Sequence, residues 1–323
     1  MEVFALAGQN LLSPIVLSFV LGFAAALARS DLTIPEAVAK GLSIYLLFAI
    51  GIKGGVGVAE SGLSPLVISS LVAGFVLSAA FPFLAFALLR VLSRLSVTDA
   101  AAVAGHYGAS SIVTFVAMTS VLDGQGVPFE GHMVAVAAVM EAPAILSALF
   151  IASTRGAGRK ISGELLHEVM LNSSIVLLVG SFIIGWVTGP AGLERIEAFV
   201  VSPFQGVLCL FLLDMGLLAG RGIRESRGTL SGGLVIFGCV MPLVGGAIGL
   251  GTGWLLGLST GGIALLTTLC ASASYIAVPA AMRVALPEAN PSVYLTLSLG
   301  ITFPFNLTAG LAIYFALARM IGG

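Results

Sequence analysis

Long stretches without any charged residue constrain this chain more than any other feature of its sequence. No Asp, Glu, Lys or Arg occurs between Arg227 and Arg283, which is room for two transmembrane helices of about 20 residues each. Four further uncharged intervals are each long enough for one such helix: 61–89, 100–122, 169–193 and 289–318. The sequence therefore predicts an all-α polytopic membrane protein.

The composition supports this class and excludes others. Charged residues make up 9% of the chain, hydrophobic residues make up 58%, and the net charge is −1. A soluble protein needs more polar side chains to cover its surface. No nucleic-acid partner is expected, because there is no basic excess to neutralise phosphates. The three cysteines lie in apolar runs without metal-ligand spacing, and we also expect no organic cofactor.

Ten transmembrane spans fit the hydrophobic pattern. They cover 11–28, 36–58, 66–91, 97–121, 131–153, 169–188, 203–221, 231–256, 261–285 and 292–318. When the N-terminus is placed outside, eleven of the 14 basic residues fall on the inner side, and the exceptions are Lys53, Arg195 and Arg319. The positive-inside rule prefers this orientation. We therefore expect a multi-pass protein with both termini outside.

The two halves of the chain resemble each other. Residues 51–61 and 216–226 match at five positions with a constant offset of 165, and both segments end in Glu-Ser. Five spans per repeat is an odd number, so residues 161–323 are expected upside down relative to residues 1–160. Inverted repeats are typical of secondary transporters, with the substrate site near the midplane between them. The alternative is that two glycine-rich helices have converged on a similar composition.

Two spans carry hydroxyl-rich segments that predict interrupted helices. The fourth contains Gly108-Ala-Ser110-Ser111, and the ninth contains Ser272-Ala-Ser274-Tyr275, each near a Gly or Pro that can break a helix. Helix N-termini direct backbone N–H groups and a positive dipole end at an anion, and serine hydroxyls there bind ligand oxygens. We therefore predict a small-anion site where the breaks meet. The alternative is that these serines only bond their own helices or join neighbouring ones.

Glu141 is the conspicuous acidic residue deep inside a predicted span. A buried ionisable residue is costly in a membrane and indicates a functional site by default. Its carboxylate suits Na⁺ together with hydroxyl and carbonyl oxygens. Its repeat mate Thr302, followed by Asn306, would add neutral oxygen ligands. The alternative is an ion pair with Lys53 or His106 that only holds helices together.

Several segments together resemble the sodium-dependent bicarbonate transporter family, whose best-known members are cyanobacterial bicarbonate uptake permeases. The resemblance covers nearly the whole chain and rests on the order and spacing of its motifs. These are Ile34-Pro35-Glu36-Ala37, Gly51-Ile-Lys-Gly-Gly55, Gly108-Ala-Ser110-Ser111, Glu141-Ala-Pro143-Ala144, Ala271-Ser272-Ala-Ser274 and Glu288-Ala-Asn290-Pro291-Ser292.

The resemblance implies ten spans in two inverted repeats, with discontinuous fourth and ninth helices, in the inner (plasma) membrane of a bacterium. It implies a gate domain of helices 1, 2, 6 and 7 and a core domain of helices 3–5 and 8–10. It further implies alternating-access symport of bicarbonate with Na⁺, a homotrimer, and a soluble regulator related to nitrogen-regulatory signalling proteins.

The candidate site residues follow by position in the motifs. The substrate-binding candidates are Ser110, Ser111, Thr114, Ser272, Ser274 and Tyr275. The sodium-binding candidates are Ser111, Glu141, Ser274, Thr302 and Asn306.

The chain departs from the cyanobacterial pattern in three ways. Tyr275 stands where those members have an Asp, and Val113 and Ala277 stand where they have further small hydroxyl residues. The connection after the fifth span also lacks their long cytoplasmic insert. Because Val113, Tyr275 and Phe303 make the site less polar, another small organic anion on the same fold is the alternative substrate.

A different class, an intramembrane serine protease, is a remote alternative. It is considered because His106 lies four residues before Ser110, within reach of a Ser–His pair along one helix. The Gly that follows the nucleophilic Ser in rhomboid proteases is absent.

Overall fold

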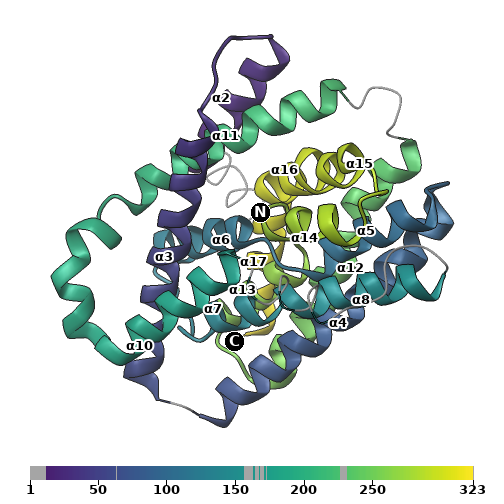
Figure 1. The fold of residues 1–323 in the computed structure, drawn as a ribbon. Helices are drawn as coiled ribbons and strands as arrows, with labels where there is room; N and C mark the ends of the chain where they lie inside the picture. Colours follow the sequence, from purple (N-terminus) through teal and green to yellow (C-terminus); the bar gives the residue numbers. More distant parts are fainter. Residues whose placement is uncertain are drawn as a thin grey trace.

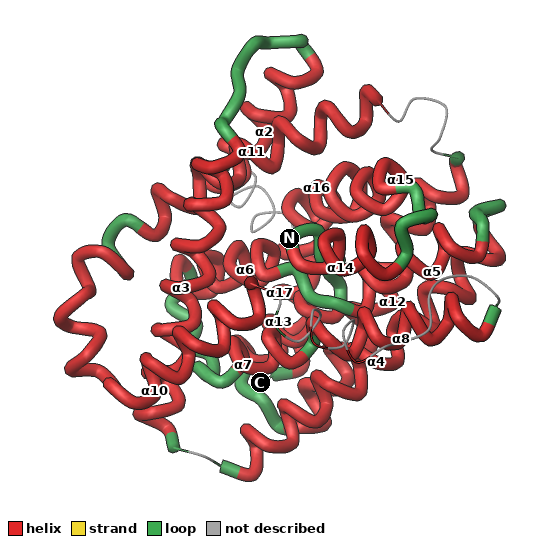
Figure 2. Tube along the Cα trace, in the orientation of Figure 1, coloured by secondary structure: helices red, strands yellow, loops and turns green. Residues whose placement is uncertain are grey.

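The computed structural model describes residues 12–62, 64–155, 163, 167, 171, 173–225 and 231–322. Within these residues the chain is helical, with connecting loops and no strand (Figure 2). Eight helical segments of the described chain are long and apolar enough to cross a membrane, which confirms the polytopic class. They are Glu36–Glu60, Pro65–Leu92, Val97–Gly124, Met133–Thr154, Ile175–Val200, Phe204–Arg224, Gly232–Leu256 and Pro291–Ile321.

The first predicted span corresponds to a shorter apolar helix, Pro14–Leu27. Another short apolar helix, Thr260–Cys270, covers the first part of the ninth predicted span. The helices in chain order are α2 (Pro14–Leu27), α3 (Glu36–Ser61), α4 (Pro65–Leu92), α5 (Val97–Gly108), α6 (Ile112–Gly124), α7 (Met133–Val139), α8 (Glu141–Thr154), α10 (Ser173–Val200), α11 (Phe204–Glu225), α12 (Gly232–Leu256), α13 (Thr260–Cys270), α14 (Ala277–Ala285), α15 (Pro291–Leu295), the π-helical η1 (Thr296–Thr302), α16 (Phe303–Phe305), the π-helical η2 (Asn306–Gly310) and α17 (Leu311–Ile321). Figure 1 shows their arrangement.

Two pairs of helices pack lengthwise against each other: α3 along α10, and α2 along α11 (Figure 1). Glycines make both contacts close. Gly55 of α3 lies against the Phe182 carbonyl of α10, and Gly216 of α11 lies against the Phe19 carbonyl of α2. A Cβ atom at either glycine would overlap that carbonyl. Gly55 and Gly216 belong to the two matching sequence segments, although at the offset of 165 they are not aligned with each other. Each segment thus provides a glycine that allows a close helix contact.

Adding a methyl group at Gly55 is expected to destabilise the α3–α10 pair. A well-packed contact that must open to admit extra atoms costs about 1–3 kcal/mol, so Gly55→Ala should lower the thermal unfolding midpoint by several degrees. Gly180→Ala on α10 is the matched control, because a Cβ atom there meets no atom within 4 Å. Thermal unfolding in detergent would compare the two variants, and equal midpoints would contradict the role of Gly55.

The remaining helices form one packed body around the breaks. α5 lies against α4 and α8, whereas α13 lies against α12, α6 and α17. The sixth predicted span ends too early, at residue 188, because helix α10 continues to Val200. It turns at Gly189, whose φ is 59°. Pro190 then stands in the first turn of the continuing helix, where its missing N–H costs no hydrogen bond.

The fifth and tenth predicted spans are less regular than the sequence pattern indicated. The fifth consists of α7 and α8, which meet at Met140. Pro143 lacks the N–H that would bond the Val139 carbonyl, and next to that gap the Ser78 hydroxyl of α4 donates to the Met140 carbonyl. The tenth contains two π-helical segments on either side of Pro304. The predicted boundary between the halves at 160/161 and the predicted span start points, 11 and 169, lie outside the described residues.

Candidate ion and anion site at the helix breaks

The first break separates α5 from α6. Ala109 and Ser111 are extended, and the Ser111 hydroxyl caps α6 by accepting a hydrogen bond from Thr114 N at 3.2 Å. Gly108 ends α5 in a place where a Cβ atom would overlap the ring of Pro82 and the methyl group of Ala144. The glycine therefore allows the break to lie deep in the packed body.

The second break separates α13 from α14 and covers residues 271–276. Pro279 lies in the first turn of α14. Because a proline N cannot donate, a continuous helix would leave the Tyr275 carbonyl without its partner four residues later. The sequence therefore stops one helix and starts the next at this point, as predicted from the Ser- and Pro-containing segment.

Hydrogen bonds join the two breaks directly. The Ser111 backbone N–H donates to the Ser272 hydroxyl at 2.8 Å. His106 and Ser274 bond twice: the Ser274 N–H donates to the His106 carbonyl at 2.8 Å, and the His106 Nδ1 donates to the Ser274 carbonyl at 2.5 Å. The His106 ring also stacks on Tyr294, with ring centroids 4.7 Å apart. The two breaks therefore cross in one rigid unit.

A small pocket lies at this crossing and is called the break cavity below. Its volume is about 20 Å³, and it is lined by Leu47, Ser110, Ser111, Ile112, Glu141, Ser274, Tyr275 and Ile276. The N-termini of α6 and α14 begin at lining residues or next to them, whereas α8 continues from α7 through Met140. Each helix N-terminus is equivalent to roughly half a positive charge, so the cavity favours negative charge.

Two polar atoms at the break cavity keep unused bonding capacity in the described part of the chain, although the Ser111 hydroxyl bonds the Tyr275 oxygen and leaves the tyrosine hydrogen free to donate. These atoms are Glu141 Oε2 and the Tyr275 hydroxyl. Glu141 is 4% exposed and Tyr275 is 8% exposed. The Ser274 hydroxyl hydrogen-bonds the Glu141 carboxyl group. Unused bonding capacity on buried polar atoms is rare and costly, and here both atoms belong to residues that line the same cavity.

The proposed structural partners of Glu141 lie elsewhere. The Lys53 ammonium group sits over the Phe204 ring, 5.4 Å from its centroid. The His106 Nδ1 is used by Ser274, and its Nε2 has no partner among the described residues. The structure therefore gives no support to an ion pair that only holds helices together.

The other candidate residues divide into two groups. Ser272 and Thr114 lie beside the cavity and form hydrogen bonds with Ser111, which lines it. The Ser272 hydroxyl accepts from the Ser111 N–H, and Thr114 Oγ1 donates to Ser111 Oγ at 3.0 Å. Thr302 and Asn306 do not line the cavity. The Thr302 hydroxyl donates to the Gly238 carbonyl at 2.7 Å.

Asn306 Nδ2 donates to the Ala271 carbonyl at 2.8 Å, and its Oδ1 accepts from the Tyr314 hydroxyl at 2.8 Å. Asn306 therefore supports the start of the second break, and its sodium-binding role remains a prediction.

The arrangement around Ser110 does not form a catalytic pair. The Ser110 hydroxyl donates to the Ala137 carbonyl at 3.1 Å, whereas the His106 ring bonds the Ser274 carbonyl. A Ser–His dyad requires the imidazole to accept the hydroxyl proton, and neither hydrogen bond has that form.

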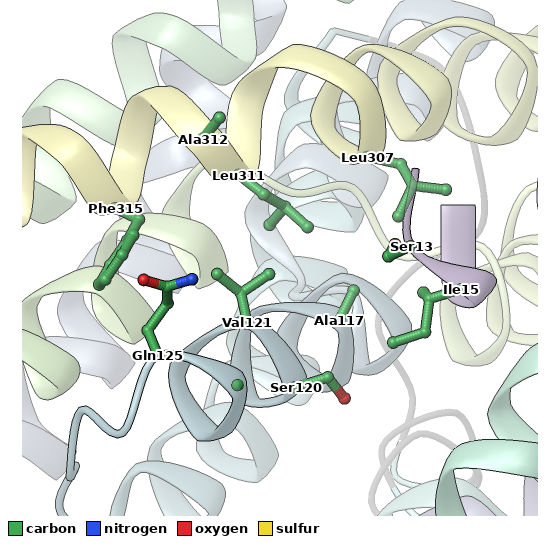
Figure 3. A pocket seen from close by; sticks show the side chains of 11 residues that line it. Ser13, Ile15, Ala117, Ser120, Val121, Gln125, Leu307, Leu311, Ala312 and Phe315 are labelled. Carbon is green, nitrogen blue, oxygen red and sulfur yellow. The ribbon is translucent and has the colours of Figure 1, made fainter. Parts of the chain in front are cut away.

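A second cavity, called the side cavity below, lies between α6 and the C-terminal helices, with the start of α2 at one end (Figure 3). Its volume is about 150 Å³, and α6 contributes Ala117, Ser120, Val121, Gly124 and Gln125 to its wall. A third pocket of about 10 Å³ is lined by Val113 and Val116 of α6, Leu46 of α3 and Phe211 of α11, and it shares Leu47, Ile112 and Ile276 with the break cavity. Gln205 of α11 donates a hydrogen bond to the Ser120 hydroxyl at 3.1 Å.

Interrupted membrane helices whose N-termini meet at a buried site define the class of this protein as a membrane transporter. A sequence profile of the Na⁺-dependent bicarbonate transporter superfamily matches residues 14–319, and the chain belongs to this family. The comparison with individual curated proteins gives no match. The family confirms the resemblance read from the motifs and suggests a small anion as substrate and sodium as the coupling ion.

Proposed function

We propose that this chain imports bicarbonate together with Na⁺ by alternating access, with both ions held at the crossing of the helix breaks. The observation that carries the proposal is the break cavity, where the N-termini of α6 and α14 meet one buried carboxyl group. Helix N-termini suit an anion, and a carboxylate suits a cation. A symporter needs both kinds of site close together.

The anion site is assigned to the two helix N-termini with the most hydroxyl groups near them. Ser110, Ser111, Ser274 and Tyr275 bring four hydroxyl groups to the break cavity. Bicarbonate is small and has three oxygens that accept hydrogen bonds from hydroxyl and backbone N–H groups. None of the described residues that line the cavity is Lys or Arg, so helix dipoles and neutral donors are assigned the binding of the anion.

The sodium site is assigned to Glu141 together with Ser111 and Ser274. Na⁺ is a hard cation, and oxygen atoms from carboxylate, hydroxyl and carbonyl groups are its natural ligands. Glu141 lies at the start of α8 and lines the break cavity, where the Ser274 hydroxyl bonds its carboxyl group. Binding of Na⁺ then balances the charge that bicarbonate brings to the site.

Transport requires the site to open to each side in turn. The helix pairs α2–α11 and α3–α10 are assigned to the gate, and the packed body that holds the breaks is assigned to the core. Leu47 of the gate helix α3 covers the break cavity. The side cavity along α6 is assigned to the outer entrance, and the narrow pocket lined by Val113, Val116, Leu46 and Phe211 is assigned to the passage between it and the site. The trimer and the soluble regulator remain predictions.

Uptake by purified protein in proteoliposomes tests the proposal. An inward Na⁺ gradient should drive accumulation of labelled bicarbonate, and replacement of Na⁺ by choline should remove it. Uptake that continues unchanged in choline would contradict Na⁺ coupling. A panel of small carboxylates added as competitors would detect the alternative substrate class, because a true organic substrate would compete better than unlabelled bicarbonate.

A further inference from the structure

The two atoms with unused bonding capacity at the break cavity differ in what they require from a ligand. Glu141 Oε2 belongs to a carboxylate, which only accepts hydrogen bonds or binds a cation. The Tyr275 hydroxyl has a hydrogen to donate. Both side chains are at least nine-tenths buried and line the same space. A single ligand that satisfies both must carry an acceptor at one end and a donor at the other.

We propose that Glu141 and Tyr275 together select an oxyanion that still carries its acid hydrogen. The Tyr275 hydroxyl donates to a charged oxygen of the anion, and Glu141 Oε2 accepts the anion's own O–H group. Bicarbonate has this combination, whereas nitrate, formate and acetate have no O–H group. The inference rests on the function proposed above and identifies the feature of bicarbonate that the site recognises.

The charges at the site are compatible with a carboxylate next to an anion. The N-termini of α6 and α14 face the anion from two sides, and the coupled Na⁺ adds a full positive charge. A hydrogen bond from O–H to a carboxylate is charge-assisted and stronger than a neutral one. Nitrate would instead bring a negatively charged oxygen against Glu141 Oε2, and formate or acetate would bring a C–H group that cannot form this charge-assisted bond.

The position of the Tyr275 hydroxyl is fixed by packing around its ring. The ring lies edge-on against Phe303, with centroids 5.3 Å apart and an interplanar angle of 64°. Phe303 in turn lies edge-on against Phe19 of α2 at 5.3 Å. The break cavity, at about 20 Å³, is close to the size of one water molecule. Bicarbonate therefore enters only when the wall on the Leu47 side draws back, while Tyr275 stays in place on the core.

Competition experiments at saturating Na⁺ test this selectivity. In wild-type protein, nitrate, formate and acetate should inhibit labelled bicarbonate uptake at least about tenfold more weakly than bicarbonate does, because each leaves a buried acceptor unpaired. In Glu141→Gln the amide group also donates, so the same anions should gain at least about tenfold relative to bicarbonate. In Tyr275→Phe all four anions should weaken together, and the half-saturating Na⁺ concentration should not change.

Glu197→Gln is the matched control, because Glu197 is an exposed carboxylate on α10. If Glu141→Gln is inactive in transport, the shift of the thermal unfolding midpoint with added bicarbonate or formate gives the same ratio without transport. An unchanged ratio in Glu141→Gln, or a Tyr275→Phe effect on Na⁺ alone, would overturn the inference and leave the proposed function standing. Absence of Na⁺-dependent bicarbonate uptake in the wild type would instead defeat the proposed function.

Discussion

Bicarbonate uptake by a Glu141→Ala variant is expected to fall about 100-fold or more at a fixed Na⁺ gradient. Glu141 provides the carboxylate that lines the break cavity, and alanine leaves a cation there with hydroxyl oxygens alone. Removing one partner of a buried charge pair typically costs about 3–5 kcal/mol. Initial rates in proteoliposomes, measured over a range of Na⁺ concentrations, give the size of the effect.

The same substitution at an exposed position separates this effect from a general loss of charge. Glu194→Ala on α10 removes an exposed carboxylate and should transport at the wild-type rate. Glu141→Ala should still elute as a folded protein in detergent, because it removes a buried group that has an unpaired oxygen. If Glu141→Ala keeps more than half of the wild-type uptake, the sodium site must lie elsewhere.

Removal of the His106 ring is expected to weaken the binding of both ions. In His106→Ala the Ser274 carbonyl loses its side-chain donor, and the stacking contact with Tyr294 becomes a void. A buried acceptor left unpaired costs about 1–3 kcal/mol, or roughly 10–100-fold in affinity if the whole effect falls on the site. The half-saturating concentrations of bicarbonate and Na⁺ should therefore rise together.

A conservative variant shows whether the hydrogen bond or the ring matters more. His106→Asn keeps an N–H donor at the same number of bonds from the backbone as Nδ1 and should recover part of the affinity for both ions. Equal behaviour of the alanine variant and the wild type would show that the crossing of the breaks does not depend on this residue. A change in the pH profile without a change in either half-saturating concentration would also contradict a positioning role.

The positions of the membrane-crossing helices were predictable, because apolar length and scarcity of charge are local properties of the sequence. The two breaks were predictable for a similar reason. Gly108 and Pro279 limit the backbone locally, and serine hydroxyls next to them cap the new helix ends. Five of the candidate residues also line one cavity in the structure: Ser110, Ser111, Glu141, Ser274 and Tyr275.

The rest depends on contacts between distant parts of the chain. His106 is a possible partner of Glu141 or Ser110 from spacing alone, and its bonds to Ser274 could not be inferred that way. The interruption at Met140 has a signal in Pro143, but the hydroxyl that bonds the Met140 carbonyl comes from Ser78 in another helix. Repeat symmetry predicts Thr302 as a sodium ligand and gives no sign that its hydroxyl donates to the Gly238 carbonyl. Symmetry of sequence does not fix which neighbour a side chain finds.

The exchange of partners between the halves has a consequence for how this protein is made. α2 and α3 leave the ribosome first, but the helices that cover their glycine faces, α11 and α10, are synthesised far later. Until α10 and α11 are inserted, the glycine-containing faces of α2 and α3 are exposed to lipid, to other membrane components or to each other. A chain truncated after α8 lacks α10 and α11, so the glycine-containing faces of α2 and α3 stay without their partners. Such truncated chains would therefore offer an exposed helix surface to membrane quality control.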